Sequence, residues 1–206
     1  MDESLNELEN FLQSKFSDEI ISTDISYDQL TVNINVSSLE ETTSFLKLNS
    51  VCQFRTLIDI TAVDYPEEEY RFQLIYHYLS MHQNFRIRIK IPVKDEEIVP
   101  SITSVFPAAN WFEREVFDMY GILFGSHPDM RRLLTDYGFK GHPLRKDFPT
   151  TGYLEVRYDQ EKKKVIYEPV KLNQEYRRFD FVSPWEGTET SIPVDLVDET
   201  GASTDE

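Results

Sequence analysis

The 206-residue sequence contains a single cysteine, Cys52, and this scarcity excludes several kinds of site. One thiol cannot close a disulfide within the chain, and alone it cannot hold an iron–sulfur cluster or a cysteine-ligated zinc ion. The GxGxxG and GxxxxGKS/T loops that bind dinucleotides and phosphates are missing, and so is the HExxH zinc motif. Cys52 has no catalytic signature beside it, so we interpret it as a small core residue.

Long hydrophobic runs and an excess of positive charge are lacking as well. The apolar runs are only a few residues long, whereas a membrane-spanning helix needs about 20 residues. The start, MDESLNELEN, has neither the basic and apolar regions of a secretory signal nor the arginines of a mitochondrial transit peptide. The net charge of −16 disfavours nucleic acid binding. We therefore expect one sizeable domain with at most an appendage, soluble or peripheral to a membrane.

What positive charge there is gathers in one part of the chain. Residues 131–178 hold 12 basic and 7 acidic side chains, a net charge of +5, whereas the rest of the chain is negative on both sides of them. We call RRLLTDYGFKGHPLRKDF (131–148) the basic segment. A positive patch in an acidic protein indicates either one acidic partner surface or internal pairing with the chain's own acidic ends.

Hydrophobic periodicity predicts an α+β fold with a mixed or antiparallel sheet flanked by helices. Ser38 with Glu41 resembles a capping box that opens the second helix. After the sheet we expect a loop-rich basic section, a β-hairpin and an extended C-terminal tail, which divides the chain into 1–126, 127–176 and 177–206. The predicted helices are 5–16, 38–49, 96–106 and 109–122, and the predicted strands are 30–36, 53–63, 70–79, 84–91 and the hairpin 153–170.

The helix predicted at ANWFEREVFDMYGI (109–122) carries more apolar surface than a surface helix needs. Asn110 is a plausible N-cap with Glu113 at the third helical position, and Gly121 is a plausible stop. Its large apolar side chains cover an arc of about 240° at 100° per residue. We therefore expect this helix to be covered on most sides, and one of the covers could be another protein.

The carboxylates of this helix and two nearby histidines raise the question of catalysis or metal binding. Glu113, Glu115 and Asp118 could serve as catalytic groups, and His127 and His142 could bind a metal with Asp129 or Asp136. The structural interpretation is simpler. Glu113 can close a capping box with Asn110, Arg114 can pair with Asp118 one turn away, and histidines before proline can anchor loops by hydrogen bonds. We favour this interpretation.

The stretch EREVFDMYGILFGSHPDMRRLL (113–134) resembles the signature of the C subunit (the 30 kDa-type subunit) of proton-pumping NADH:quinone oxidoreductase, respiratory complex I. The family pattern is Glu-Arg-Glu, an acid, two apolar residues, a His or Lys, a basic residue and paired aliphatics. Here it is filled by Glu113, Arg114, Glu115, Asp118, Met119, Tyr120, His127, Arg131, Leu133 and Leu134. LTDYGFKGHPLRKDFPTTGYLEVRYD and RRFDFVSPWE are also similar to the respiratory members, so the resemblance runs from about Phe54 to Trp185.

The resemblance implies a component of the peripheral arm that binds no cofactor itself. It packs mainly on the D subunit, with the B subunit nearby, while other subunits carry NADH, FMN, the iron–sulfur clusters and quinone. On this interpretation the basic segment is a docking surface, and residues 177–195 lie across the D subunit as a strap. The expected docking residues are Glu113, Arg114, Glu115, Asp118, His127, Arg131, Arg132, His142, Arg145, Lys146, Phe179, Phe181 and Trp185.

Two other interpretations remain open from the sequence. One is the same role in a related complex with another electron donor, such as the photosynthetic ferredoxin-fed enzyme. The other is a stand-alone metal-dependent hydrolase using Glu113, Asp118, His127 and His142. The expected location is the cytoplasmic side of the bacterial inner membrane, or the matrix side of the mitochondrial inner membrane for an organelle-encoded chain.

Overall fold

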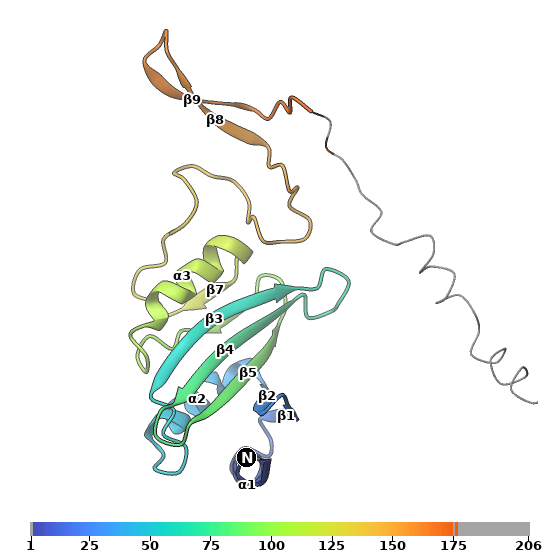
Figure 1. Cartoon of the computed structure of the whole chain (residues 1–206), viewed down its shortest axis with the longest axis vertical. Helices are drawn as coiled ribbons and strands as arrows, with labels where there is room; N and C mark the ends of the chain where they lie inside the picture. Colours follow the sequence, from blue (N-terminus) through green and yellow to red (C-terminus); the bar gives the residue numbers. More distant parts are fainter. Residues whose placement is uncertain (1, 175, 177–206) are drawn as a thin grey trace, which may run out of the picture. The chain divides into compact units, whose positions relative to one another are not determined.

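The computed structural model describes residues 2–174 and 176, which form an α+β fold as predicted (Figure 1). The chain divides into two compact units, the first ending at Tyr153 and the second beginning at Leu154. The elements of the first unit are α1 (Asp2–Lys15), β1 (Ile20–Ser26), β2 (Gln29–Ile34), a 3-10 turn (Val36–Ser38), α2 (Leu39–Leu48), β3 (Thr56–Asp64), β4 (Phe72–Ser80), β5 (Phe85–Val93), β6 (Ile98–Pro100), α3 (Ala109–Tyr120) and β7 (Leu123–Gly125). The second contains β8 (Leu154–Asp159) and β9 (Lys164–Pro169).

The main sheet has five strands in the order β1-β2-β5-β4-β3. Strands β3, β4 and β5 form an antiparallel meander, and the β1–β2 hairpin joins it through a parallel pairing of β2 with β5. Buried and half-buried residues alternate along the whole of β4, because successive side chains point to opposite faces. The sheet is therefore mixed, as the sequence predicted.

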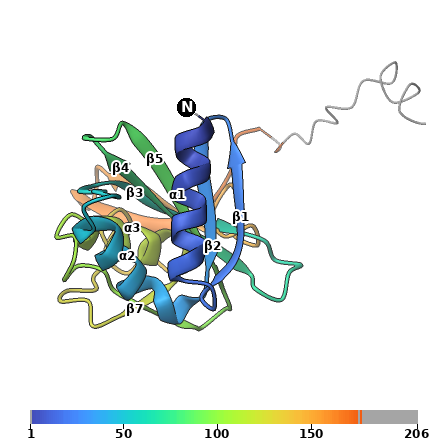
Figure 2. The same ribbon diagram turned by 90° about the horizontal axis from the view of Figure 1, so that it is seen from below.

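Helices α1 and α2 cover one face of this sheet with their apolar stripes. Leu5, Leu8 and Leu12 of α1 and Phe16 directly after it are all buried, at the spacing that predicted the helix. The ring of Phe16 stands edge-on to that of Phe45 on α2, with centroids 5.1 Å apart. Figure 2 shows α1 lying alongside β2. These side chains and the inward residues of β2, β4 and β5 make one core.

Two predictions about these elements were wrong, and one strand was missed. Residues 96–106 are not a helix: Ile98–Pro100 is a short strand paired with Leu123–Gly125, and only one turn follows, at Ile102–Phe106. Proline has no N–H to donate in a helix, and Pro100 lies inside the predicted range. The Ser38 hydroxyl donates to the Asn35 carbonyl instead of capping α2. Strand β1 was missed because its residues are mostly polar and partly exposed at the sheet edge.

The hairpin predicted at 153–170 is confirmed as β8 and β9. Among the residues that the structure describes, no helix combines the length and the apolarity needed to cross a membrane.

Candidate functional site

Helix α3 carries the signature residues and begins differently from its prediction. It starts at Ala109 after Ala108, which supplies no side-chain cap, so Asn110 lies inside the helix and the capping box with Glu113 does not form. The predicted end is confirmed. Gly121 has a left-handed φ of +82° and donates its N–H to the carbonyl of Phe117, an arrangement that glycine adopts without strain.

Glu113 is completely buried and ties α3 to the segment that follows β6. Its Oε2 accepts the hydroxyl of Ser101 at 2.6 Å, and its Oε1 accepts the N–H of Ile102 at 2.8 Å. Burial raises the pKa of Glu113 to about 7, although both hydrogen bonds act in the opposite direction. The Tyr76 hydroxyl is buried without a hydrogen-bond partner in the described chain. Burial raises the pKa of Tyr76, and the Glu113 charge acts in the same direction.

His127 lies beside this carboxyl but is held by the backbone. Its Nδ1 accepts the N–H of Asp129 at 3.0 Å, so its Nε2 carries the hydrogen and donates to the carbonyl of Asn110 at 3.1 Å. The Nε2 atom is 3.9 Å from Oε2 of Glu113. In a Ser-His pair the imidazole is hydrogen-bonded to the hydroxyl, whereas here the Ser101 hydroxyl donates to Glu113, which lies between it and the ring. The two ring nitrogens of His127 therefore hold the loop at Asp129 to the start of α3.

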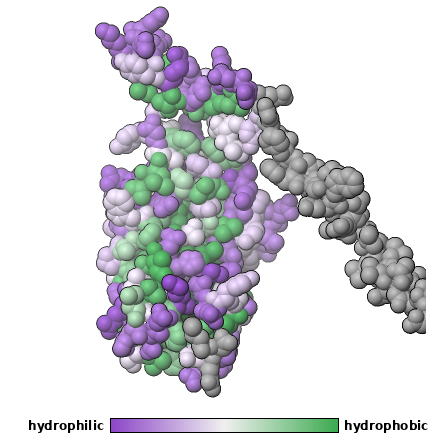
Figure 3. Space-filling view, viewed as in Figure 1, coloured by the Kyte–Doolittle hydropathy of each residue, from purple (hydrophilic) through white to green (hydrophobic). Residues whose placement is uncertain are grey.

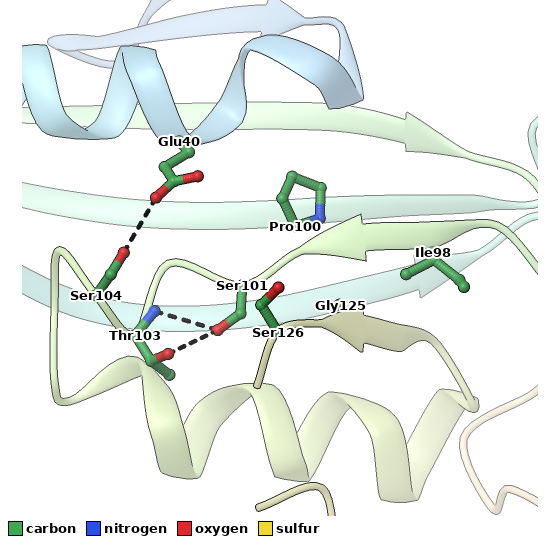
Figure 4. A pocket seen from close by; sticks show the side chains of 8 residues that line it. All are labelled: Glu40, Ile98, Pro100, Ser101, Thr103, Ser104, Gly125 and Ser126. Carbon is green, nitrogen blue, oxygen red and sulfur yellow. Dashed lines mark hydrogen bonds between the residues drawn. The ribbon is translucent and has the colours of Figure 1, made fainter. Parts of the chain in front are cut away.

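A shallow pocket of about 400 Å³ lies next to Ser101. Figure 4 shows the Ser104 hydroxyl directed at the Glu40 carboxylate, 3.2 Å away, and the N–H of Thr103 directed at the Ser101 hydroxyl. The hydroxyls of Ser101 and Ser104 are thus each engaged in hydrogen bonds within the chain.

Asp118 organises the start of the basic segment. Its Oδ2 accepts three consecutive backbone N–H groups, those of Leu133, Leu134 and Thr135, at 2.7–3.0 Å. Its Oδ1 accepts the Thr135 hydroxyl at 2.6 Å and the guanidinium of Arg132 at 3.0 Å. Burial by itself would raise the pKa of Asp118, but these hydrogen bonds outweigh it and lower the pKa to about 2.

Arg114 does not pair with Asp118 as predicted. Its guanidinium donates to the backbone carbonyls of Arg131 at 3.0 Å and Arg132 at 3.3 Å. Arg114 and Asp118 therefore bind the same loop, one through its carbonyls and the other through its N–H groups. Both are loop anchors.

The last carbonyls of α3 are capped by a later part of the basic segment. The carbonyl of Asp118 accepts His142 Nδ1–H at 3.0 Å, and that of Met119 accepts the N–H of Leu144 at 3.1 Å. The carbonyl of Tyr120 accepts Nε–H of Arg145 at 2.5 Å. A Cβ on Gly121 would come within 2.7 Å of His142 and 2.8 Å of Arg145. The absent side chain is thus what admits these capping groups.

A second ion-pair cluster joins the basic segment to the ends of β3 and β4. The side chain of Asp64 is fully buried. It accepts hydrogen bonds from Nε and Nη2 of Arg71 at 2.8 and 3.2 Å and from the backbone N–H of Lys146 at 2.7 Å. Arg145 pairs with Asp95 at 3.1 Å, and Arg71 pairs with Asp147 at 2.9 Å. Arg132 and Arg145 are therefore paired within the chain, but their partners Asp118 and Asp95 lie on α3 and next to the sheet and not in the acidic ends that the sequence suggested.

The sequence did not identify Asp64 and Arg71 as parts of this cluster, nor Ser101 as the partner of Glu113. Asp64 ends one strand and Arg71 immediately precedes the next, which pairs with it antiparallel. That adjacency is a signal that the hairpin prediction could have used. Ser101 gave no signal, because its bond to Glu113 joins segments 12 residues apart that were both predicted as helix.

A smaller set of the predicted site residues is on the surface. Glu115 and the side chain of Lys146 are exposed, and Arg131 is exposed but paired with Asp129. Exposed apolar side chains accompany them, namely Trp111, Leu134, Tyr137 and Leu144. Figure 3 shows hydrophobic residues among hydrophilic ones at the surface over α3 and the sheet strands. Phe179, Phe181 and Trp185 lie outside the described residues.

The two histidines that could have shared a metal are kept apart. His127 is bonded to Asn110 at the start of α3 and His142 to Asp118 near its end, a separation of roughly 12 Å along the axis at 1.5 Å per residue. In the part of the chain that the structure describes, no three His, Cys, Asp or Glu side chains are grouped as a metal site would require.

Comparison with known proteins gives consistent matches. A sequence model described as "Respiratory-chain NADH dehydrogenase, 30 Kd subunit" matches residues 32–154. The chain is 62% identical to the C subunit of NADH-quinone oxidoreductase from Dinoroseobacter shibae, over 95% of this chain and 91% of that protein. It is 58% identical to the protein of the same name from Ruegeria pomeroyi, over 95% and 98%.

A solved structure shares the fold. It belongs to the membrane-bound sulfane sulfur reductase, described as an archaeal respiratory membrane complex, with a TM-score of 0.60 and 24% identity. The match covers 70% of this chain and 85% of that one.

Proposed function

Because the chain belongs to the 30 kDa subunit family of the respiratory-chain NADH dehydrogenase, we propose that it is the C subunit of such a complex, with a structural and assembly role and no catalytic residue of its own. In this proposal the complex oxidises NADH through FMN and iron–sulfur clusters, reduces quinone and translocates protons. The other subunits hold all of these groups.

One observation carries the proposal: the polar signature side chains are used to hold the subunit together. Glu113, Arg114, Asp118 and His127 bond to backbone groups or to side chains of neighbouring loops. A catalytic acid or base must instead face a cleft with a reacting group within hydrogen-bond reach. These bonds hold α3 and the basic segment in one fixed conformation, as a docking subunit needs.

The state of the only thiol supports the same conclusion. Cys52 is buried, and burial raises its pKa to about 11. Nucleophilic and metal-binding chemistry needs the thiolate, which such an environment disfavours. The chain is thus poorly equipped for redox chemistry, and electron transfer in the proposed complex passes through other subunits.

The proposed partners are the D subunit, as the main contact, and the B subunit. The exposed side chains of Glu115, Arg131 and Lys146, with the apolar surface of Trp111 and Leu134, would face them. Aromatic and arginine side chains are common at such interfaces. The relatives are bacterial, and we place the protein on the cytoplasmic side of the inner membrane, attached through the complex.

The test is co-purification of the tagged full chain from detergent-solubilised membranes of its own host. We expect the D and B subunits to be recovered with it, together with NADH:quinone reductase activity. The chain purified alone should show no flavin absorbance, no iron and no NADH oxidation. Stoichiometric iron or flavin on the isolated chain, or recovery without the other subunits, would overturn the proposal.

A further inference from the structure

The hairpin of β8 and β9 has two chemically different faces. Residues directly opposite each other in an antiparallel pair share a face. The pairs Leu154–Pro169, Val156–Tyr167 and Tyr158–Val165 put apolar and aromatic side chains on one face. The pairs Glu155–Glu168, Arg157–Ile166 and Asp159–Lys164 put mainly charged side chains on the other. We call the first the apolar face.

The side chains of the apolar face are exposed. Leu154, Val156, Tyr158, Val165 and Tyr167 are each 53–60% accessible. The opposite face is internally bonded, since Arg157 and Glu168 form an ion pair at 2.8 Å. Alternation of apolar and charged residues is typical of a strand with one buried face, yet the face expected to be buried is the open one.

The turn of the hairpin is well formed, which makes the exposure more significant. Asp159 Oδ1 accepts the N–H groups of Glu161 and Lys162 at 2.9 and 3.0 Å, and Lys163 takes the left-handed conformation, with φ of +50°. A two-stranded hairpin is nevertheless at best marginally stable in water by itself. A sequence that specifies this hairpin and gives it an apolar face therefore needs something to cover that face.

We propose that the apolar face of β8 and β9 is a docking surface, covered by an apolar patch of another subunit whose border carries carboxylates facing Lys163 in the turn. The inference deepens the proposed function and rests on it. Lys163 is exposed and has no ion-pair partner among the described residues, so an acidic border would complement it.

The available area argues against a second copy of this chain as the occupant. Five side chains that are more than half exposed offer on the order of 500 Å², taking roughly 100 Å² for each. A stable interface takes about 800 Å² from each partner. Two hairpins packed face to face would fall short of this area. A larger partner can supply the remainder by extending its contact to neighbouring parts of the chain.

The experiment compares two adjacent residues of β9 on opposite faces. Val165→Glu places a charge on the apolar face, and Ile166→Glu makes the same change on the other face, opposite Arg157, where the new carboxylate is well placed. Each full-length variant replaces the native chain in its host. The fraction of the chain in the NADH:quinone oxidoreductase complex is then measured by native gel electrophoresis of solubilised membranes.

We expect Val165→Glu to lower the assembled fraction by about tenfold or more, which corresponds to at least about 1.4 kcal/mol, and Ile166→Glu to leave it near the wild-type value. Equal assembly of the two variants would overturn the inference while wild-type assembly still supports the proposed function. If the wild-type chain is not in the complex at all, the proposed function itself fails.

Measurements on the isolated wild-type chain distinguish the other occupants. Hydrogen exchange should show rapid exchange of the β8 and β9 amides, and sedimentation should show a monomer. Protected hairpin amides in the monomer would mean that the chain covers its own apolar face. A dimer that Val165→Glu dissociates would mean that a second copy does. Either result would overturn the inference.

Discussion

Replacing Glu113 by Gln should remove a pH dependence of stability that the buried carboxyl confers. The folded-state pKa of about 7 exceeds the ordinary value of 4.5, so the folded chain binds this proton more tightly than the unfolded chain. The associated stabilisation is fully present below about pH 4.5 and is lost as the pH rises through 7. The difference between the two pKa values corresponds to about 3 kcal/mol.

The variant isolates this effect because Gln cannot ionise yet keeps an oxygen for the N–H of Ile102. Urea unfolding of the full chain at pH 5, 6, 7 and 8 gives the free energy of unfolding for both proteins. The difference, variant minus wild type, should grow by about 2 kcal/mol or more between pH 5 and pH 8. Most of that growth should fall between pH 5 and pH 7.

Glu115→Gln is the matched control, since Glu115 is on the same helix but exposed. Glu115→Gln removes a carboxylate from the same helix while the buried Glu113 stays in place, and its unfolding is measured at the same four pH values. Parallel curves for wild type and Glu113→Gln would refute the reasoning, because they would show that Glu113 is ionised in the folded chain throughout. Loss of folding in Glu113→Gln at pH 5 would refute it as well.

Two further predictions concern the loop anchors. Asp118→Asn should destabilise the chain by about 3–5 kcal/mol, because the amide cannot accept three N–H groups and leaves Arg132 without its carboxylate. The folded-state pKa of Asp118 is about 2, so its contribution to stability is present above about pH 4 and is lost as the pH falls through 2. Urea unfolding and amide exchange at residues 133–135 measure this, and unchanged exchange would contradict it. Arg145→Ala should lower the free energy of unfolding by about 2 kcal/mol, because the bonds to Tyr120 and Asp95 are lost. Lys146→Ala removes an exposed side chain and keeps the backbone N–H bond to Asp64, so it should change the free energy of unfolding by no more than about 0.5 kcal/mol. Equal effects of the two variants in thermal unfolding would show that internal pairing does not contribute to stability.

The sequence predicted the elements whose burial follows a strict period. Strand β4 alternates from Phe72 to Ser80, and α1 repeats its leucines at three and four residues, because each has one face on the core. The same rule failed at 96–106, where Ile98 and Ile102 have helical spacing. Pairing with β7, more than 20 residues later in the sequence, decided the local structure there.

The sequence identified the signature residues of the candidate site but not their hydrogen-bond partners. Capping boxes and i,i+4 pairs are local rules, and they suggested Asn110 for Glu113 and Arg114 for Asp118. The structure instead bonds Glu113 to Ser101 and Asp118 to residues 132–135. These partners lie 12–17 residues away in sequence. Only the tertiary fold brings them within reach.

The parallel pairing of β2 with β5 sets an order on folding during synthesis. The β1–β2 hairpin leaves the ribosome well before β5. Leu30 and Val32 acquire their neighbours Ile87 and Ile89 only when 57 more residues have followed, which takes on the order of 3–11 s at 5–20 residues per second. During this interval one edge of β2 is open, and α1, followed by α2, is the cover already made for its apolar face. An amphipathic helix at the front of the chain thus serves the nascent protein as an early shield, before the sheet it covers is complete.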